Sequence, residues 1–274
     1  MMVGIQQKEL MLGKMMNTTQ KVLFILESNK GTYTSGEEMA RQCGISRNAV
    51  WKAIKDLRAK DYSIDAVSNK GYKLTGNIDI ISAEGIMAEL PEALRDAEIL
   101  VYDSLESTSD KAKELAVKGA SHGTSVVAVT QTGGRGRKDH SFFSPEGGIY
   151  LSIILSPEKL SDTDSKAVTA FVGGAVINAI RELTGIETYM DGINDLYVDG
   201  KKICGILLES GSEYDSNTLQ WIVAGIGINF DSDIRRFPKD VKERAAGLFG
   251  PGKAPITKNK LIAGIIEKII NCQP

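Results

Sequence analysis

The chain has 274 residues, 42% of them hydrophobic and 25% charged, a composition that excludes a disordered protein and leaves room for two domains. It contains no secretory signal and no apolar run of the roughly 18 residues that span a bilayer, so we expect a cytoplasmic location and no membrane partner. The formal net charge of −2 is unevenly spread, because residues 1–75 carry 12 Lys and Arg against 7 Asp and Glu. A basic first part and an acidic remainder indicate that nucleic acid is bound at one end only.

The basic part is predicted to form a domain at residues 17–77, after a tail at residues 1–16. Apolar residues at helical spacing indicate a first helix, for which Thr18 or Thr19 is available as the N-terminal cap. A short second helix follows Ser35, which is placed to cap it, and ends at a glycine turn.

A third helix is predicted after Ser46, with Val50, Ile54 and Leu57 on its apolar face and basic residues elsewhere. This order of helix, glycine turn and basic helix is a helix-turn-helix arrangement, and the alternation around Asn69 predicts a hairpin with a basic tip. We therefore expect a winged helix-turn-helix domain that binds DNA. The residues expected to contact DNA are Ser46, Arg47, Asn48, Trp51, Lys52, Lys55 and Lys70.

Within this set, Arg47 is expected to reach a base edge, and Lys52, Lys55 and Lys70 are expected to contact phosphates. The alternative interpretation is a protein-binding module whose surface charges are merely solvated. Phosphate contacts make DNA affinity fall steeply with salt, so the salt dependence of binding distinguishes the two.

The acidic remainder, residues 78–274, is predicted to mix strands with a few helices in an α+β fold. Ser107 and Thr108 are placed to cap a helix after the first strand, and Gly173 and Gly174 are expected to let a long helix pack closely. The later strands are expected at residues 124–130, 148–157, 187–190, 195–210 and 219–230, the fourth stretch being a hairpin that turns at Asp199 and Gly200.

The loop "QTGGRGRKDHSFFSP" at residues 131–145 places Arg135 and Arg137 between glycines. Such a loop cannot fill a core, and its backbone can approach a ligand closely because glycine lacks a Cβ. Guanidinium groups are planar donors with a fixed charge that suit phosphate and carboxylate oxygens. The loop therefore predicts an anion-binding site.

Further polar residues in loops and at strand ends provide hydroxyls, amides, cations and one carboxylate, without an obvious nucleophile. Such a set stabilises charge during displacement at phosphorus, where catalysis is mainly positioning and neutralisation. The product would be an acyl adenylate or a similar species. The residues of this set are Ser107, Thr108, Gln131, Arg135, Arg137, Asn194, Asp195, Lys202 and Asn229.

Cysteine and histidine chemistry is not expected to contribute. Cys43, Cys204 and Cys272 are odd in number and far apart, which fits neither a disulfide framework nor paired zinc ligands, so we expect buried apolar side chains. His122 and His140 are the only histidines, which disfavours a histidine-based metal site or a nucleophilic triad. No metal-ligating residues are predicted.

Five strings follow the predicted winged helix-turn-helix in order: "ESTSDKA", "QTGGRGR", "FFSPEGGIYLSIIL", "NDLYVDGKKICGILLE" and "AGIGINF". Over about residues 18–270 the chain thereby resembles the bifunctional biotin protein ligases, which also repress biotin-synthesis genes. The resemblance implies a mixed-sheet catalytic domain of the biotin/lipoate ligase type at residues 78–274, and a DNA-binding transcriptional repressor that acts on an operator.

The reaction that this resemblance implies has two steps. Biotin and ATP, with Mg²⁺, give biotinyl-5′-AMP and pyrophosphate, and a lysine of the biotin carboxyl carrier domain of acetyl-CoA carboxylase then takes the biotin. Ordering of the arginine loop on the adenylate could complete the surface of a homodimer. A lipoate ligase shares the catalytic fold but does not usually carry a winged helix-turn-helix.

The resemblance implies catalytic roles for Lys202, Arg135 and Arg137. The residues implied to bind biotin or its adenylate are Ser107, Thr108, Ser109, Gln131, Gly134, Arg135, Gly136, Arg137, Phe142, Asn194, Asp195, Lys202, Gly205, Gly225, Gly227 and Asn229. Simpler roles stay open for some of these residues. Asn194 and Asp195 could serve merely to form a turn, Ser107 and Thr108 could serve merely to cap their helix, and glycines in strands can mark bulges.

The sequence also departs from the family's pattern. Asp191, Gly192 and Ile193 stand where the family usually has Lys-Trp-Pro, so an anion replaces a cation near the expected phosphates. After Arg137 the family usually has a basic residue, a glycine and an arginine, then a tryptophan, whereas this chain reads Lys138, Asp139, His140, Ser141 and Phe142. The family's small C-terminal β domain is expected to be absent. The alternative function is therefore a biotin- or biotinyl-AMP-responsive transcription regulator with weak or no ligase activity.

Overall fold

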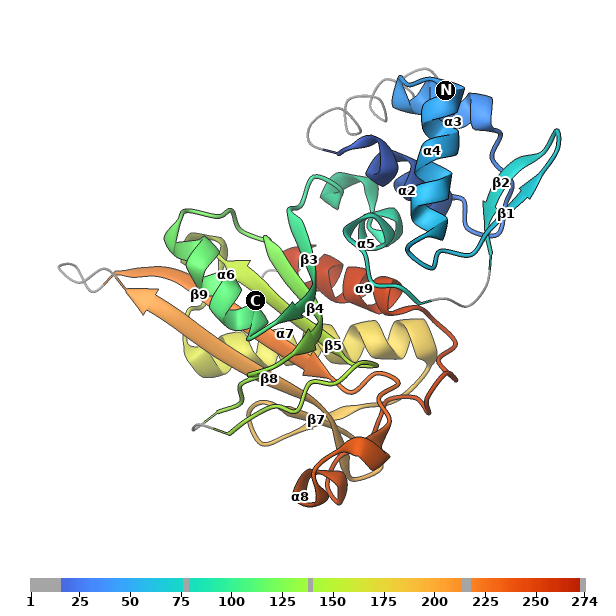
Figure 1. Cartoon of the computed structure of the whole chain (residues 1–274). Coiled ribbons are helices and arrows are strands. Elements are labelled where there is room, and N and C mark those ends of the chain that lie inside the picture. Colours follow the sequence, from blue (N-terminus) through green and yellow to red (C-terminus); the bar gives the residue numbers. More distant parts are fainter. Residues whose placement is uncertain (1–15, 76–78, 138–139, 213–217, 272–274) are drawn as a thin grey trace. The chain divides into compact units, whose positions relative to one another are not determined.

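The protein is described by a computed structural model that covers residues 16–75, 79–137, 140–212 and 218–271 (Figure 1). Its packing divides the chain into two compact units between Asp96 and Ala97. The boundary expected from the sequence follows residue 77. The division by packing falls later because α5 (Ala83–Glu89) packs against α2 (Thr18–Ser28) of the first unit.

Two helices of the first unit begin at the predicted side-chain caps. Ser35 accepts a hydrogen bond at 3.1 Å from the backbone N–H three residues on, at the start of α3 (Gly36–Cys43). Ser46 does the same at 3.2 Å for α4 (Arg47–Arg58). Each cap satisfies an N–H group that has no partner within its helix.

The predicted cap of α2 at Thr18 or Thr19 is wrong. The Asn17 side chain accepts a hydrogen bond from the Gln20 N–H at 3.0 Å, and the Gln20 side chain accepts one from the Asn17 N–H at 2.9 Å. This reciprocal pair satisfies two donors at once, so the helix begins one residue earlier than a threonine cap would allow.

The core of the first unit joins the three helices. Val50, Ile54 and Leu57 of α4 are at most 1% exposed, as the sequence predicts. They pack with buried residues of α2 and α3, among them Leu26 and Met39. The helix-turn-helix is therefore held by side chains that all face inward.

The predicted wing is confirmed as an antiparallel pair of β1 (Ile64–Val67) and β2 (Gly71–Leu74). Asn69 in its turn has a φ of +62°, a left-handed conformation that Asn tolerates. Thr34 and Tyr72 exchange two backbone hydrogen bonds of 2.9 Å. These bonds tie the wing to the segment before α3.

The second unit is built on a seven-stranded mixed sheet, as predicted, with the order β3-β4-β5-β9-β8-β7-β6. β3 and β4 are parallel and all other neighbours are antiparallel. The turn between β7 and β8 lies at Asp199 and Gly200, which have φ angles of +48° and +75°. The strands are β3 (Ile99–Leu105), β4 (Ser125–Gln131), β5 (Ile149–Leu155), β6 (Tyr189–Asp191), β7 (Asp195–Val198), β8 (Lys201–Ser212) and β9 (Leu219–Ile228).

Helices cover both faces of this sheet (Figure 1). α6 (Thr108–Val117) packs on β4, β5 and β9, whereas α7 (Ser165–Thr184) packs against β8 and α9 (Lys258–Asn271) on the other face. β5 is buried along its whole length because it is covered from both sides. Short helical elements are η1 (Glu92–Leu94), η2 (Pro157–Lys159), η3 (Ile234–Arg236) and α8 (Lys239–Lys242).

The long helix α7 uses one of its two expected glycine contacts. A Cβ atom on Gly173 would lie 1.8 Å from the Met190 side chain, so the glycine permits a close approach. Gly174 faces open space, and the expectation for it is wrong. Among the described residues α7 is the one helix long and apolar enough to cross a bilayer, but its apolar side is packed on α9 and the sheet, as in a core helix.

Two cysteines are buried, as predicted. Burial raises the pKa of the Cys43 thiol to about 11 and also raises the pKa of Cys204. Both thiols therefore stay protonated near neutral pH and act as apolar side chains. Cys272 lies outside the described residues.

Substitution of Gly71 by Ala is expected to loosen the first unit. Gly71 has a φ of +106°, and a Cβ there would lie 2.1 Å from the Thr34 carbonyl oxygen. We expect a loss of at least about 2 kcal/mol in local stability, measured by hydrogen exchange of α2 to α4 in the whole chain. Gly44→Ala is the control, because Gly44 has a φ of +65° with open space around it and should cost only about 1 kcal/mol. Equal effects of the two variants would contradict the steric argument.

Candidate functional site

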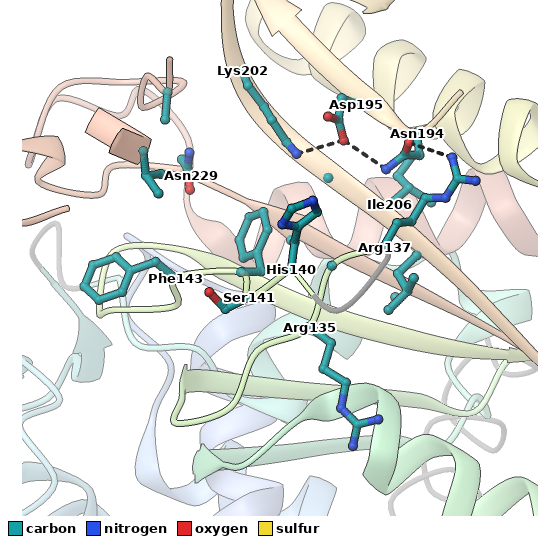
Figure 2. A pocket seen from close by; sticks show the side chains of 18 of the residues that line it. Arg135, Arg137, His140, Ser141, Phe143, Asn194, Asp195, Lys202, Ile206 and Asn229 are labelled. Carbon is teal, nitrogen blue, oxygen red and sulfur yellow. Dashed lines mark hydrogen bonds and ion pairs between the residues drawn. The ribbon is translucent and has the colours of Figure 1, made fainter. Parts of the chain in front are cut away.

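A cavity of about 570 Å³ opens in the second unit on the face of the sheet that carries α6. Its walls come from the start of α6, the loop after β4, the β7–β8 hairpin and the end of β9 (Figure 2). Gly134, by contrast, is buried behind the wall, against Phe142 and Ser144. The predicted substrate-binding residues that line the cavity are Ser107, Thr108, Ser109, Gln131, Arg135, Gly136, Arg137, Phe142, Asn194, Asp195, Lys202, Gly205, Gly225, Gly227 and Asn229.

Glycines hollow the sheet beneath this cavity. Gly205 of β8 lies opposite Gly227 of β9, and Gly225 lies two residues away on the same face. The ring of Phe142 occupies the space over the first pair, because a Cβ on Gly227 would come within 2.7 Å of the ring. A Cβ on Gly225 would lie 2.6 Å from the Ser109 hydroxyl. These glycines therefore seat an aromatic ring and a hydroxyl rather than marking bulges.

A chain of hydrogen bonds runs through the buried end of the cavity. The Ser152 hydroxyl donates to Thr108 Oγ1 at 2.8 Å, and Thr108 donates to Gln131 Oε1 at 3.1 Å. Gln131 Nε2 in turn donates to the Ser144 hydroxyl at 2.9 Å, and Ser144 donates to the Phe142 carbonyl at 2.8 Å. The start of α6 and the loop after β4 are thus locked together in one orientation.

The positions of Ser107 and Thr108 at the start of α6 explain why these hydrogen bonds form at the buried end of the cavity. Ser107 caps α6, with its hydroxyl 3.4 Å from the Asp110 N–H, and the Thr108 N–H donates to Gln131 Oε1 at 2.8 Å. Both residues are 4% exposed. Capping and cavity lining therefore coexist in Ser107, whereas Thr108 is the first residue of the helix and does not cap it.

Lys202, Asp195, Asn194 and Arg137 form a second network on the opposite wall (Figure 2). Asp195 Oδ1 accepts from Lys202 Nζ at 2.8 Å and from Asn194 Nδ2 at 3.0 Å. Arg137 donates to Asn194 Oδ1 at 3.3 Å. Asn194 and Asp195 are thus more than turn formers, because their side chains hold two cations that line the cavity.

Arg135 does not join this network. Its guanidinium group forms an ion pair with Asp110 of α6 and points away from Lys202 (Figure 2). The structure thus separates two residues that were predicted to act together, although both line the cavity.

The segment around α8 was missed by the sequence analysis. The Lys202 N–H donates to the Arg244 carbonyl and the Ala246 N–H donates to the Lys202 carbonyl, each at 2.9 Å. Asn229 Nδ2 donates to the Ala246 carbonyl at 3.1 Å, and the buried Asn229 Oδ1 has no hydrogen-bond partner in the described structure. The cavity residues that were not predicted are His140, Ser141, Phe143, Tyr197, Ile206, Leu207, Ile226, Phe237, Pro238, Asp240, Val241, Arg244 and Ala245.

Little in the sequence marks these residues. Tyr197, Ile206 and Leu207 lie within strings already tied to the site. Alternation along β8 could have indicated Leu207, which lies two residues from Gly205 on the same face, whereas Ile206 is directed toward α7. The α8 segment is brought to the cavity by its backbone pairing with Lys202, by the bond from Asn229 to Ala246 and by the contact of Phe237 with Phe143. Burial, together with the charges of Asp195 and Asp191, raises the pKa of the Tyr197 phenol, which therefore stays a neutral hydrogen-bond donor.

In the first unit, every residue predicted to contact DNA is exposed. Trp51 is 52% exposed, and the Lys55 ammonium lies 5.9 Å from the centre of its ring. At the wing, Lys70 and Lys73 lie 5.9 and 4.5 Å from the ring centre of Tyr33. Helix α4 and the wing thus each present basic side chains beside an aromatic ring.

Comparison with known proteins identifies both units. Residues 101–229 match the biotin/lipoate A/B protein ligase family, and residues 18–73 match an HTH domain. A ligase-type catalytic domain and a helix-turn-helix domain are therefore joined in one chain.

The curated relatives have the same combination. The chain is 36% identical over 261 residues to the bifunctional ligase/repressor BirA of Bacillus subtilis, a match that covers 94% of this chain and 78% of that protein. It is 29% identical over 259 residues to BirA of Escherichia coli, with 92% and 76% covered. The chain belongs to the family of bifunctional ligase/repressors, as the sequence motifs predicted.

A solved structure supports the fold of the catalytic unit. The biotin protein ligase from Aquifex aeolicus, in complex with biotin and ATP, matches with a TM-score of 0.54 and 28% identity. The match covers 64% of this chain and 69% of that chain.

Substitution of Gly227 by Ala is expected to displace the Phe142 ring. The new methyl group would overlap the ring, and overpacking of this kind costs about 1–3 kcal/mol. We expect lower stability in urea and faster chymotrypsin cleavage at Phe142. Gly174→Ala on α7 serves as the control, because it faces open space and should leave both measurements near the wild type or raise stability slightly. Unchanged cleavage in Gly227→Ala would show that the ring is not seated there.

Proposed function

We propose that this protein is an ATP-dependent biotin protein ligase that also acts as a DNA-binding repressor of biotin genes. The observation that carries the proposal is the network in which Lys202 and Arg137 are oriented by Asp195 and Asn194 beside a hollowed sheet. Family membership and the exposed basic face of the helix-turn-helix support the two activities together.

In the first step, a carboxylate oxygen of biotin attacks the α-phosphorus of ATP and pyrophosphate leaves, giving biotinyl-5′-AMP. Negative charge that develops on the phosphoryl oxygens is offset by the Lys202 ammonium. Lys202 has three donors and only one is used by Asp195, so the ion pair holds the ammonium in place while leaving donors for the substrate. Arg137 contributes in the same way, because its described partner, Asn194, is neutral.

In the second step, the amine of a lysine on a biotin carboxyl carrier domain attacks the acyl carbon of the adenylate. The amide bond forms, the bond between the acyl carbon and the phosphate oxygen breaks, and AMP leaves with the electron pair while the amine loses a proton. The carrier is proposed from the family resemblance to be that of acetyl-CoA carboxylase.

Individual side chains suit the parts of this adenylate. We propose that Ser107, Thr108 and Gln131, which line the cavity, contact the polar biotin ring system. Asn229 Oδ1 is a buried acceptor without a protein partner, which suits an N–H donor such as the adenine amino group. Phe142 offers an aromatic face to the same base.

Magnesium is proposed as part of the ATP substrate. The described residues contain no group of three or more His, Cys, Asp or Glu side chains that could hold a resident ion. Asp195, the carboxylate nearest to Lys202, already accepts two hydrogen bonds. The ion is therefore expected to enter and leave with the phosphates.

As a repressor, the protein is proposed to bind operator DNA with α4 in the major groove and the wing on the backbone. A ligand-promoted homodimer would bring two such units to two half-sites. We also propose a cytoplasmic location, because ATP, the carrier domain and operator DNA all occur there.

One observation favours the alternative function, a regulator with weak or no ligase activity. Asp191 lies opposite Asp195 in the β6–β7 pair and adds negative charge beside the network. A regulator that binds biotin or biotinyl-AMP without transferring it would tolerate this charge better than a ligase.

Transfer of radiolabelled biotin to an apo carrier domain tests the ligase. We expect transfer by the wild type and a loss of about 100-fold or more in Lys202→Ala, because a charge-stabilising donor is removed. Lys201→Ala is the matched control, since Lys201 is exposed and outside the cavity lining and should retain nearly full activity. Biotin binding without transfer by the wild type would favour the regulator instead.

The salt dependence of operator binding tests the DNA-binding face. Substitution of Lys55 by Gln is expected to weaken binding and to lower the slope of log K against log salt by about one, because one phosphate contact is lost. Lys60→Gln removes the same charge from an exposed residue outside the predicted contacts and should leave the slope unchanged. A wild-type slope near zero would favour a protein-binding module.

A further inference from the structure

Arg135, which lines the cavity, stands at one end of a row of alternating charges. Its guanidinium group pairs with Asp110 Oδ2. The other oxygen of that carboxylate lies 3.0 Å from Lys113 Nζ, and Lys113 lies 2.6 Å from Glu209 Oε1 on β8. The row runs positive, negative, positive, negative, so each charge in it is compensated.

The two ends of this row differ in exposure to solvent. Side-chain exposure falls from 48% at Arg135 to 31% at Asp110, 24% at Lys113 and 23% at Glu209. Asp110 is also fixed by its place in the first turn of α6, where a carboxylate is favoured. Arg135 is therefore the member that can leave, and Asp110 the one that stays.

Lys113 holds the Asp110 carboxylate in place through their ion pair. Burial lowers the pKa of Lys113, but its hydrogen bonds to Glu209 and Asp110 outweigh this effect and leave the pKa raised. The Lys113 ammonium is thus charged at neutral pH, and Glu209 of β8 binds it.

The two arginines of the loop therefore have different kinds of partner. Arg137 contacts the neutral Asn194, whereas Arg135 contacts a full negative charge. A ligand carboxylate or phosphate that recruits Arg135 must displace Asp110 first, which reduces the net gain from that contact.

We propose that Asp110 is a positioning residue for the ligase reaction, which holds Arg135 away from Lys202 until an anionic ligand displaces it. The inference rests on the proposed function, because the displacing anion is the carboxylate of biotin or the phosphate of its adenylate. Asp110 acts through Arg135 and does not itself contact the reacting atoms.

Calorimetric titration of the whole chain tests this role with a non-hydrolysable analogue of biotinyl-5′-AMP. Asp110→Asn keeps the shape of the side chain and removes its charge, so we expect binding about two- to fivefold tighter, the range of a partly exposed ion pair. Biotinamide, which is uncharged, should bind with unchanged affinity. Glu114→Gln is the matched control, because Glu114 pairs with Lys111 and Lys118 on the same helix and not with Arg135.

A double-mutant cycle distinguishes loss of the Asp110–Arg135 ion pair from a general change in the electrostatic field of the cavity. In an Arg135→Gln background, Asp110→Asn should no longer tighten binding of the analogue. Persistence of the effect there, or weaker or unchanged binding in Asp110→Asn alone, would overturn the proposal.

Two further measurements keep the interpretation clear. Thermal unfolding of each variant distinguishes a changed site from a changed fold, and Asp110→Ala provides a second uncharged variant if the first is unstable. Failure of the wild type to bind the analogue at all would count against the proposed function rather than against the role of Asp110.

Discussion

The absence of side chains at Gly205, Gly225 and Gly227 is the constraint on which the catalytic unit depends. A glycine in a strand weakens it, because it adds conformational entropy and no packing. Here the strands tolerate this cost because their other face is covered by α7 and α9. The hollow that results admits Phe142 and the first turn of α6, and it leaves room for a ligand above the sheet. Any larger side chain would fill the space that the chemistry requires.

Charge is arranged around this hollow so that the two walls are held in different ways. Lys202 is fixed by its side chain to Asp195 and by its backbone to the segment after α8. Arg135, on the opposite side, is held by a carboxylate on α6. One cation is thus preorganised, and the other must exchange partners, which fits a loop that first admits a substrate and then retains a reactive intermediate.

Much of the fold could be predicted because the signals are local. Ser35 and Ser46 cap helices with their own neighbours, and Asp199 with Gly200 forms a turn from adjacent residues. The cap of α2 was misplaced because three successive residues can each cap a helix. Asn17 is the better cap by residue type, and its reciprocal bond with Gln20 adds to this preference. The cavity residues within the quoted strings were predictable because these strings lie at strand ends, which a mixed sheet brings to one place, whereas those around α8 were not.

The sequence by itself determined the identity of the units, the chemical types at the site and most helix and strand positions, because these depend on neighbouring residues and on strings in a fixed order. Tertiary structure alone decided that α5 packs with the first unit, that the α8 segment pairs with Lys202, and that Arg135 meets Asp110 instead of the other cations. Each of these contacts joins residues far apart in the chain. Which residues meet therefore depends on how the whole fold packs and on which charges it brings together, and neighbouring residues alone do not determine this.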